Sequence, residues 1–342
     1  MRKLNNTLYV TNPEYYLGRD GNTIEVRENS SRIAKLPIHN FENIVCFNYT
    51  GVSPGLLKLC AENGVTVTYM SPSGKYIGAF ETEIRGSVLT RKKQYEAAED
   101  PEECLIYSKL FIIGKIQNSI ENLDRRRRDL DDQRETLRIK IDELKEWKEM
   151  CCGAKTCDEL RGYEGLAARA YFSSFEKLIL QQKEDFVFNG RNKRPPLDFV
   201  NALLSLAYGF LRIKVEGALQ AAGLDPYMGF FHTERPGRTS LALDVMEEMR
   251  PYIADRMVLS VINRKQITKR DFLVQANGAV EFTEDGFKKF IKYWNDYLLD
   301  EITHPFLQEK IQKGLLPFCQ AMLLAQSIRK ELDVYPPYIT QR

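Results

Sequence analysis

Apolar and polar residues alternate with a period of two through much of the first 85 residues, a pattern typical of β-strands. Thr23–Arg27 alternates most clearly, and the preceding Asp20-Gly21 is a favoured hairpin turn. One helix is expected at Pro54–Asn63, because proline stands at its first position and Gly64 follows its end. The other predicted strands are Thr7–Val10, Tyr15–Leu17, Ile44–Phe47, Val65–Tyr69 and Tyr76–Phe80.

From about Ser87 onward the apolar residues recur every three or four positions, which predicts helices. Cys104–Asn122 has this spacing, and the strongly charged stretch that follows, as far as Met150, predicts a long solvated helix or a helical hairpin. Arg125–Arg128 would be spread around such a helix, so a solvated face is the default interpretation and a phosphate contact the alternative. We therefore predict a multidomain α+β protein, with a small β-rich domain at residues 1–86 and a larger all-α domain at residues 87–342.

Composition narrows the class of protein. The chain has 342 residues, 43% of them hydrophobic, which predicts a folded protein and excludes disorder throughout. Its 49 Lys and Arg against 47 Asp and Glu leave a net charge of +2, so nucleic-acid binding would have to rest on local basic clusters. Polar Asn5-Asn6-Thr7 stand near the start of the chain, where a signal peptide would have an apolar run, and no apolar run approaches the roughly 18 residues of a membrane span. The seven cysteines are an odd number at irregular spacing, which suits reduced thiols. We expect a cytoplasmic protein that does not bind membranes.

The common motifs for nucleotide binding, zinc proteolysis and serine hydrolysis are missing, so candidate chemistry must be sought around single residues. Among three histidines, His232 lies just before a Pro-Gly turn and a helix that Thr239 or Ser240 can cap and Pro251 helps to end. Helical spacing puts Asp244, Glu247 and Glu248 on one arc of that helix. The alternative is an ordinary amphipathic helix whose acids face water.

A further carboxylate, Glu164, interrupts a stripe of apolar residues at helical spacing between residues 156 and 182. A buried carboxylate must bind a cation, pair with a base or become neutral. Glutamate, histidine and aspartate ligands together suit manganese or magnesium, and such a site favours phosphate chemistry. Arginines, which bind phosphate with two parallel hydrogen bonds, are concentrated nearby. They are Arg191, Arg194, Arg235, Arg238 and Arg250, together with Lys193.

At these residues the chain resembles the universal CRISPR-associated spacer-acquisition integrase family, also described as metal-dependent DNA endonucleases, over nearly its whole length. The motifs are Tyr163-Glu164-Gly165, Arg191-x-x-Arg194-Pro195-Pro196-x-Asp198, Gly229-Phe230-x-His232, Arg235-x-Gly237-Arg238 and Asp244-x-x-Glu247-x-x-Arg250-Pro251. The resemblance implies a β-rich N-terminal domain followed by a helical catalytic domain.

The resemblance also implies roles for single residues. The family's metal ligands map onto Glu164, His232 and Glu247, where several members have aspartate at the last position. Asp244 matches an acid beside the site, either a supporting residue or a ligand of a second metal, so the choice of third ligand stays open between Asp244 and Glu247. The DNA-binding residues would be Arg191, Arg194, Arg235 and Arg238.

The implied reaction is attack by the 3′-hydroxyl of protospacer double-stranded DNA on a phosphodiester of the CRISPR repeat, with Mn²⁺ or Mg²⁺ as cofactor. The implied partners are a second copy of the chain, which the short strands of the β domain also favour, a small CRISPR-associated protein ("Cas two") and in some systems an accessory nuclease. Two other hypotheses remain. One is a non-enzymatic DNA-binding scaffold whose acids form structural salt bridges, and the other is a metallohydrolase for small phosphoesters.

Overall fold

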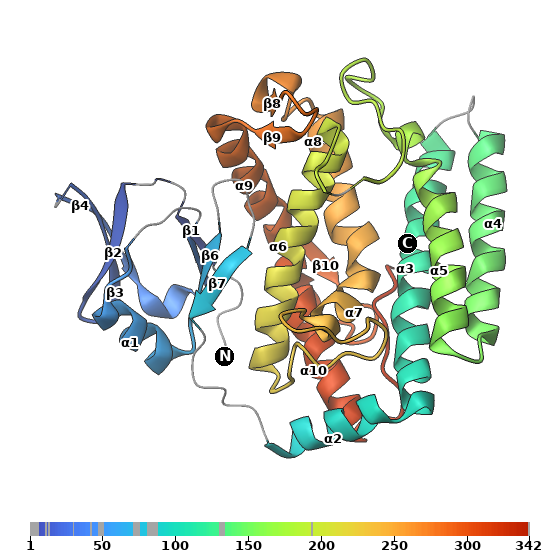
Figure 1. Ribbon diagram of the computed structural model, residues 1–342, viewed down its shortest axis with the longest axis horizontal. Coiled ribbons are helices and arrows are strands. Elements are labelled where there is room, and N and C mark those ends of the chain that lie inside the picture. The colour runs from blue at the N-terminus through green and yellow to red at the C-terminus, as the bar shows by residue number, and fades with distance from the viewer. Residues whose placement is uncertain are drawn as a thin grey trace. The chain divides into compact units, whose positions relative to one another are not determined.

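The structure, a computed structural model, describes residues 7–10, 12, 14–29, 31–41, 43–46, 51–70, 76–80, 88–129, 134–192 and 194–340. The chain divides into two compact units, Met1–Arg85 and Gly86–Arg342. The first is rich in strands and the second is mostly helical, which confirms the predicted fold class (Figure 1). The predicted domain boundary, between residues 86 and 87, falls within a segment, 81–87, that lies outside the described residues.

The N-terminal unit contains two sheets. A mixed sheet has the strand order β1-β5-β6-β7, in which β1, β5 and β6 are parallel and β7 is antiparallel to β6. An antiparallel sheet has the order β2-β3-β4, and its first hairpin pairs Asp20 with Thr23 around Gly21, as the turn sequence predicts. The strands are β1 (Thr7–Val10), β2 (Tyr15–Asp20), β3 (Thr23–Glu28), β4 (Ser31–Pro37), β5 (Asn43–Cys46), β6 (Thr66–Met70) and β7 (Tyr76–Phe80).

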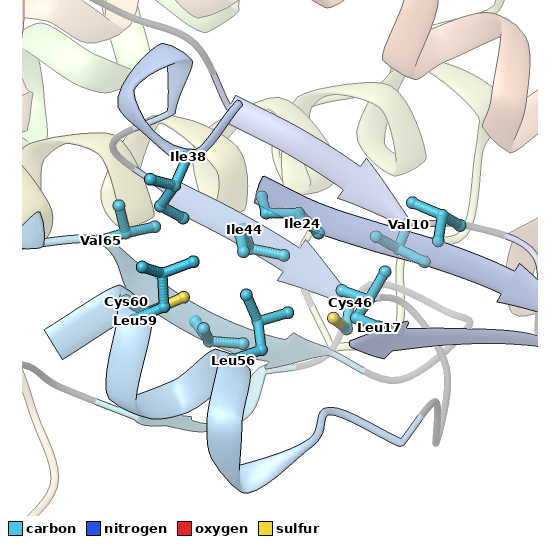
Figure 2. Packing of buried hydrophobic residues seen from close by; sticks show 12 residues of the cluster. Val10, Leu17, Ile24, Ile38, Ile44, Cys46, Leu56, Leu59, Cys60 and Val65 are labelled. Atoms are coloured by element: carbon cyan, nitrogen blue, oxygen red, sulfur yellow. The ribbon is translucent and has the colours of Figure 1, made fainter. Parts of the chain in front are cut away.

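The core of this unit forms where α1 (Pro54–Asn63) packs its apolar side chains against the strands (Figure 2). The helix has the predicted bounds. The Ser53 hydroxyl accepts a hydrogen bond from the Leu56 N–H at its start, and Gly64 ends it in the left-handed conformation at φ +71°. Strand β4 was not predicted, because it is an edge strand with mostly exposed side chains and therefore shows little apolar alternation. A short 3-10 turn, Ile38–Asn40, follows it.

In the helical unit, α3 (Pro101–Asp129), α4 (Arg134–Gly153) and α5 (Cys157–Phe172) pack side by side (Figure 1). Two small antiparallel strand pairs, β8–β9 and β10–β11, correct the prediction that this domain is all-α. No helix within the described ranges is long and apolar enough to cross a membrane. The other elements are α2 (Val88–Glu99), α6 (Phe199–Ala221), α7 (Ser240–Met249), α8 (Arg256–Asn263), α9 (Glu284–Leu299), α10 (Leu316–Ile328), β8 (Phe272–Val274), β9 (Val280–Phe282), β10 (Glu301–Thr303) and β11 (Lys310–Gln312), with 3-10 turns at Phe175–Leu178, Lys269–Asp271 and Lys313–Leu315 and a π-helical turn at Arg250–Asp255.

Of the two structures predicted for the strongly charged stretch after Asn122, the helical hairpin is confirmed. The helices α3 and α4 are separate and pack against each other. Their connection, residues 130–133, lies outside the described residues. Of the four consecutive arginines, Arg127 and Arg128 form ion pairs with Asp124 at 2.7 and 3.0 Å. These two side chains therefore bind a carboxylate on their own helix.

Candidate active site

Glu164 is positioned by α5, whose first turn is capped by the Thr156 hydroxyl, which accepts a hydrogen bond from the Glu159 N–H. The apolar stripe predicted on this helix is buried, and Glu164 lies within it with 22% of its side chain exposed. Its Oε1 accepts a hydrogen bond from the ammonium group of Lys115 on α3. Glu164 is therefore paired with a base, one of the three states expected for a carboxylate in an apolar stripe.

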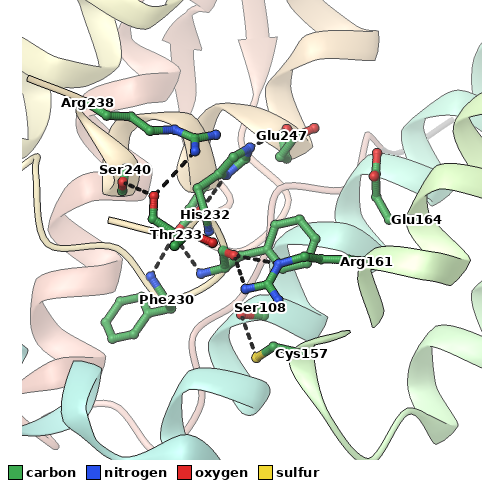
Figure 3. A network of polar contacts seen from close by, with 12 residues as sticks. Ser108, Cys157, Arg161, Glu164, Phe230, His232, Thr233, Arg238, Ser240 and Glu247 are labelled. Atoms are coloured by element: carbon green, nitrogen blue, oxygen red, sulfur yellow. Dashed lines mark hydrogen bonds and ion pairs between the residues drawn. The ribbon is translucent and has the colours of Figure 1, made fainter. Parts of the chain in front are cut away.

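His232 lies in the loop between α6 and α7, and the carboxylate of Asp244 holds that loop. Asp244 is completely buried and accepts four hydrogen bonds. They come from the backbone N–H groups of Phe230 (2.7 Å), Phe231 (2.9 Å) and His232 (2.9 Å), and from Nδ1 of His232 (2.6 Å). Because Nδ1 is engaged, the imidazole presents Nε2 to Glu247, whose Oε1 is 3.8 Å away (Figure 3). Asp244 thus orients the histidine and has both of its oxygens occupied.

Two further features fix this loop. Arg161 on α5 donates a hydrogen bond from its Nη2 to the Phe231 carbonyl at 2.9 Å. A Cβ atom on Gly229 would lie 2.8 Å from Oδ2 of Asp244 and 2.8 Å from Cβ of Ser240. Glycine is required at position 229 because the start of α7 approaches the loop so closely.

The acids of α7 do not face water, so the interpretation of this segment as an ordinary amphipathic helix is wrong. Asp244, Glu247 and Glu248 are all buried, because α7 packs against α3, α6 and α10. The three acids also do not act together. Glu248 accepts hydrogen bonds from Tyr335 and Gln320 near the C-terminus, both at 2.7 Å, and burial raises its pKa to about 8. Glu248 is therefore outside the candidate site, although helical spacing grouped it with the others.

Glu247 is an ionised carboxylate in the protein interior. Burial alone would raise its pKa, but the charges of Arg250, Lys115 and His232 outweigh this effect and hold the pKa at about 2. Arg250 Nη1 is 2.6 Å from Oε1 of Glu247, and Lys115 Nζ is 2.8 Å from Oε2. Among the described residues, the ammonium of Lys115 is the one cation in contact with this buried Oε2.

The predicted ligands Glu164, His232 and Glu247 come from α5, the loop before α7, and α7 itself, and they fit a divalent cation by chemistry. Two carboxylates and one imidazole are a common donor set for manganese. Nε2 of His232 faces Glu247, and Oε2 of Glu247 faces the ammonium of Lys115. In the described part of the chain, no three Asp, Glu, His or Cys side chains already surround a common metal position. Between Glu164 and Glu247 lies the ammonium of Lys115.

The predicted DNA-binding arginines occupy two kinds of environment. Arg194 and Arg235 are exposed, and Arg238 is partly exposed on the same loop as His232. Arg191 instead points inward, donating from Nη1 to Asn201 Oδ1 at 2.6 Å, with its guanidinium carbon 5.2 Å from the centre of the Tyr208 ring. Arg235 and Arg238 thus lie on the loop that carries His232, whereas Arg191 has its guanidinium engaged by Asn201 and Tyr208.

A cavity of about 340 Å³ adjoins Glu164 and contains residues that the sequence did not single out. These are Lys115 and Asp255, which line the cavity together with Tyr208 and Arg250. Burial raises the pKa of Asp255 to about 6. The sequence contained one indication that Lys115 is special, because it is the single charged residue between Lys109 and Glu121 in an apolar helix. The sequence contained no such indication for Asp255, because its partners Tyr171 and Tyr208 come from distant parts of the chain.

Comparison with known proteins places this site in a family. The family model described as CRISPR associated protein Cas1 matches residues 8–296. The CRISPR-associated endonuclease Cas1 1 of Chlorobaculum tepidum is 40% identical to the chain, and the similarity covers 99% of both sequences. A Cas1 protein from Thermotoga maritima has a similar fold, with a TM-score of 0.83 at 22% identity, covering 98% of this chain and all of the other.

The fold is also similar to that of a casposase bound to integration product, with a TM-score of 0.82 at 19% identity over 98% of this chain and 94% of the other. At such identities the structural similarities concern the fold alone, whereas the family model and the 40% identical relative concern the sequence itself. The motifs around Glu164, His232 and Glu247 lie within the residues that the family model matches. The chain therefore belongs to the Cas1 family of CRISPR-associated proteins.

Proposed function

We propose that the protein is a metal-dependent DNA integrase and endonuclease that inserts protospacer DNA into a CRISPR array. The observation that carries the proposal is the buried, ionised Glu247, whose Oε1 is 3.8 Å from Nε2 of His232 and whose Oε2 shares the ammonium of Lys115 with Glu164. The endonuclease name of the Chlorobaculum tepidum relative and the integration product bound to the casposase support the same class of reaction.

In this proposal Glu164, His232 and Glu247 hold Mn²⁺ or Mg²⁺. The cation would activate an oxygen nucleophile and neutralise the charge that develops on phosphorus. Asp244 keeps Nδ1 of His232 engaged and thereby leaves Nε2 free to act as a ligand. With all its lone pairs directed at N–H donors, Asp244 is the positioning residue, and we assign the third ligand to Glu247.

The protein's other residues bind and orient DNA. Arg194, Arg235 and Arg238 are accessible to phosphates, while Arg191 and Arg250 line the cavity beside Glu164. A 3′-hydroxyl that attacks a phosphodiester exchanges one such bond for another, which is consistent with a chain that has no nucleotide-binding motif. By family membership we further propose a homodimer, a complex with the small Cas2 protein and, in some systems, an accessory nuclease.

The test is strand transfer of short duplexes with free 3′-hydroxyls into a supercoiled target, with and without Mn²⁺. Glu164→Ala and His232→Ala should abolish strand transfer while most of the duplex affinity survives. Glu176→Ala is the matched control, because Glu176 is exposed just beyond the same helix. Strand transfer at the parent rate by either variant would refute the ligand assignment.

A DNA-binding scaffold is the second candidate, since Lys115, Arg250 and the two glutamates do form a salt-bridge network. The scaffold hypothesis expects duplex affinity that is indifferent to Mn²⁺ and no joined product. It also expects Glu164→Ala to lower the stability of the helical unit without changing any metal binding, because the parent would bind none. Isothermal titration of the parent with Mn²⁺ separates the two functions.

A further inference from the structure

Lys115 occupies an unusual position for a lysine. It lies in the middle of α3, on a helix face that packs against α5 and α7, and 14% of its side chain is exposed. Its ammonium group contacts carboxylates from both of these helices. It donates a hydrogen bond to Oε1 of Glu164, and it is 2.8 Å from Oε2 of Glu247. The ammonium therefore lies between the two carboxylates that the proposed function assigns to the metal.

The charges around this point balance only with Lys115 in place. Within the described ranges Glu164 has no other ion pair, and Glu247 has Arg250 on its Oε1 side. Without a cation, two carboxylates facing each other in a buried site would repel strongly. The ammonium of Lys115 contacts an oxygen of each glutamate, so its positive charge lies between the two negative ones. In this structure the positive charge between the two carboxylates is that of Lys115, at the place where a divalent metal would carry it.

We propose that Lys115 is a built-in competitor of the metal, whose ammonium holds Glu164 and Glu247 together in the metal-free protein and must leave when a cation binds. The proposal rests on the proposed function, because it takes these glutamates as ligands. An ammonium in contact with both carboxylates and a metal bound by both cannot share the space between them. The adjoining cavity of about 340 Å³, which Lys115 itself lines, gives its flexible side chain room to move.

This competition has a measurable consequence for metal affinity. Lys115→Met keeps the length and the apolar stem of the side chain and removes the charge. The variant should bind Mn²⁺ at least about tenfold more tightly than the parent in isothermal titration, because the metal no longer displaces an ion-paired ammonium. The metal-free variant should also unfold at a lower temperature, and saturating Mn²⁺ should restore most of the difference.

Lys313→Met is the matched control. Lys313 is equally buried, with 13% of its side chain exposed, and it also forms an ion pair, at 2.7 Å from Asp300. Its contacts are Asp300 and the ring of Tyr297, neither of which belongs to the proposed metal site. This variant should lose stability like Lys115→Met but keep the parent's affinity for Mn²⁺.

The outcomes separate this inference from the proposed function. Parental or weaker Mn²⁺ affinity in a folded Lys115→Met protein would overturn the competition while leaving the metal site intact. Absence of Mn²⁺ binding in the parent and in Lys115→Met alike would overturn the metal site, and the competition with it. Tighter binding that disappears when Glu164→Ala is added to Lys115→Met supports both.

A second measurement uses the parent protein and does not depend on whether the variant folds. Lysines are reductively methylated under native conditions, with and without saturating Mn²⁺, and the modification of Lys115 is followed by peptide mass spectrometry. The ion-paired ammonium of Lys115 should react slowly without Mn²⁺ and clearly faster with it. Lys313 should react at the same rate in both conditions. An unchanged rate at Lys115 on metal binding would contradict the proposal.

Discussion

Asp255 is a buried acid whose charge can be tested directly, because it is held by hydroxyl groups and not by a direct salt bridge. The side chains of Tyr208 and Tyr171 donate hydrogen bonds to its Oδ1 and Oδ2 at 2.7 and 3.0 Å. Burial raises the pKa of Asp255 from 3.8 to about 6, although both tyrosines and the charges of Arg191 and Arg250 act in the opposite direction. The folded protein therefore holds this proton more tightly than the unfolded chain does.

The raised pKa of Asp255 determines the sign and the size of the change in stability with pH. As pH rises from 3.8 to about 6, the unfolded chain releases the proton while the folded protein still retains it, so the free energy of unfolding falls. A shift of about 2 pH units at about 1.4 kcal/mol per unit corresponds to a loss of about 3 kcal/mol. Above pH 6 both states are ionised, and the loss stays constant.

Asp255→Asn removes this titration and changes little else. The two tyrosine hydroxyls can accept as well as donate, so they can reorient toward an amide. Urea unfolding of variant and parent is compared from pH 4 to pH 7 by tryptophan fluorescence, since Trp147 and Trp294 both belong to the helical unit. The difference in unfolding free energy should move in favour of the variant by roughly 2 kcal/mol across this range, because the unfolded carboxyl is already more than half ionised at pH 4.

Two results would refute this reasoning. A difference between variant and parent that is independent of pH means that the Asp255 carboxyl has the same pKa in the folded and unfolded protein. A difference that moves in favour of the parent as pH rises means that Arg191 and Arg250 lower the pKa by more than burial raises it. All other titrating groups are common to both proteins and cancel in the comparison.

Four further predictions concern the loop that carries His232, the DNA-binding arginines and assembly. Asp244→Asn turns an amide nitrogen toward two of the four N–H donors, so it should destabilise the helical unit to urea by about 3 kcal/mol or more. It should also weaken Mn²⁺ binding roughly 10–100-fold in isothermal titration. An unchanged metal affinity would mean that Asp244 does not position His232. Gly229→Ala should disturb the same loop and lower the melting temperature, whereas Gly209→Ala, where a Cβ meets no atom within 4 Å, should not. Arg194→Ala should weaken binding to all duplexes and reduce the salt dependence of log affinity by roughly one unit, measured by salt titration without metal; a parental slope would exclude a phosphate contact. Light scattering at micromolar concentration should give the mass of a dimer, and a monomer would count against the proposed assembly.

Local sequence patterns were sufficient for most elements of the N-terminal unit. The hairpin around Gly21 and the helix Pro54–Asn63 were predictable because turn and cap residues act on their immediate neighbours. Strand β4 escaped prediction because an edge strand buries few side chains. The four short strands of the helical unit were missed for a similar reason, since segments of three residues are too short to show a period.

At the site, sequence motifs identified the residues Glu164, His232 and Glu247, and the structure supplied their relationships. Helical spacing alone grouped Glu248 with the other acids of α7, but its partners, Tyr335 and Gln320, lie more than 70 residues away in the chain. Spacing shows which arc of a helix a residue occupies but not which neighbour covers that arc. The burial of all three acids could be known only from the packing of α7.

The sequence by itself determined the division into a β-rich and a helical half, the family and the identity of the candidate ligands, because these depend on residue types and their local order. Only the tertiary structure decided that Asp244 orients His232 and that Lys115 lies between Glu164 and Glu247. Lys115 is 49 residues from Glu164 and 132 from Glu247 along the chain. The strength of an ion pair depends on distance and burial in three dimensions, neither of which is encoded in the spacing of residues along the chain.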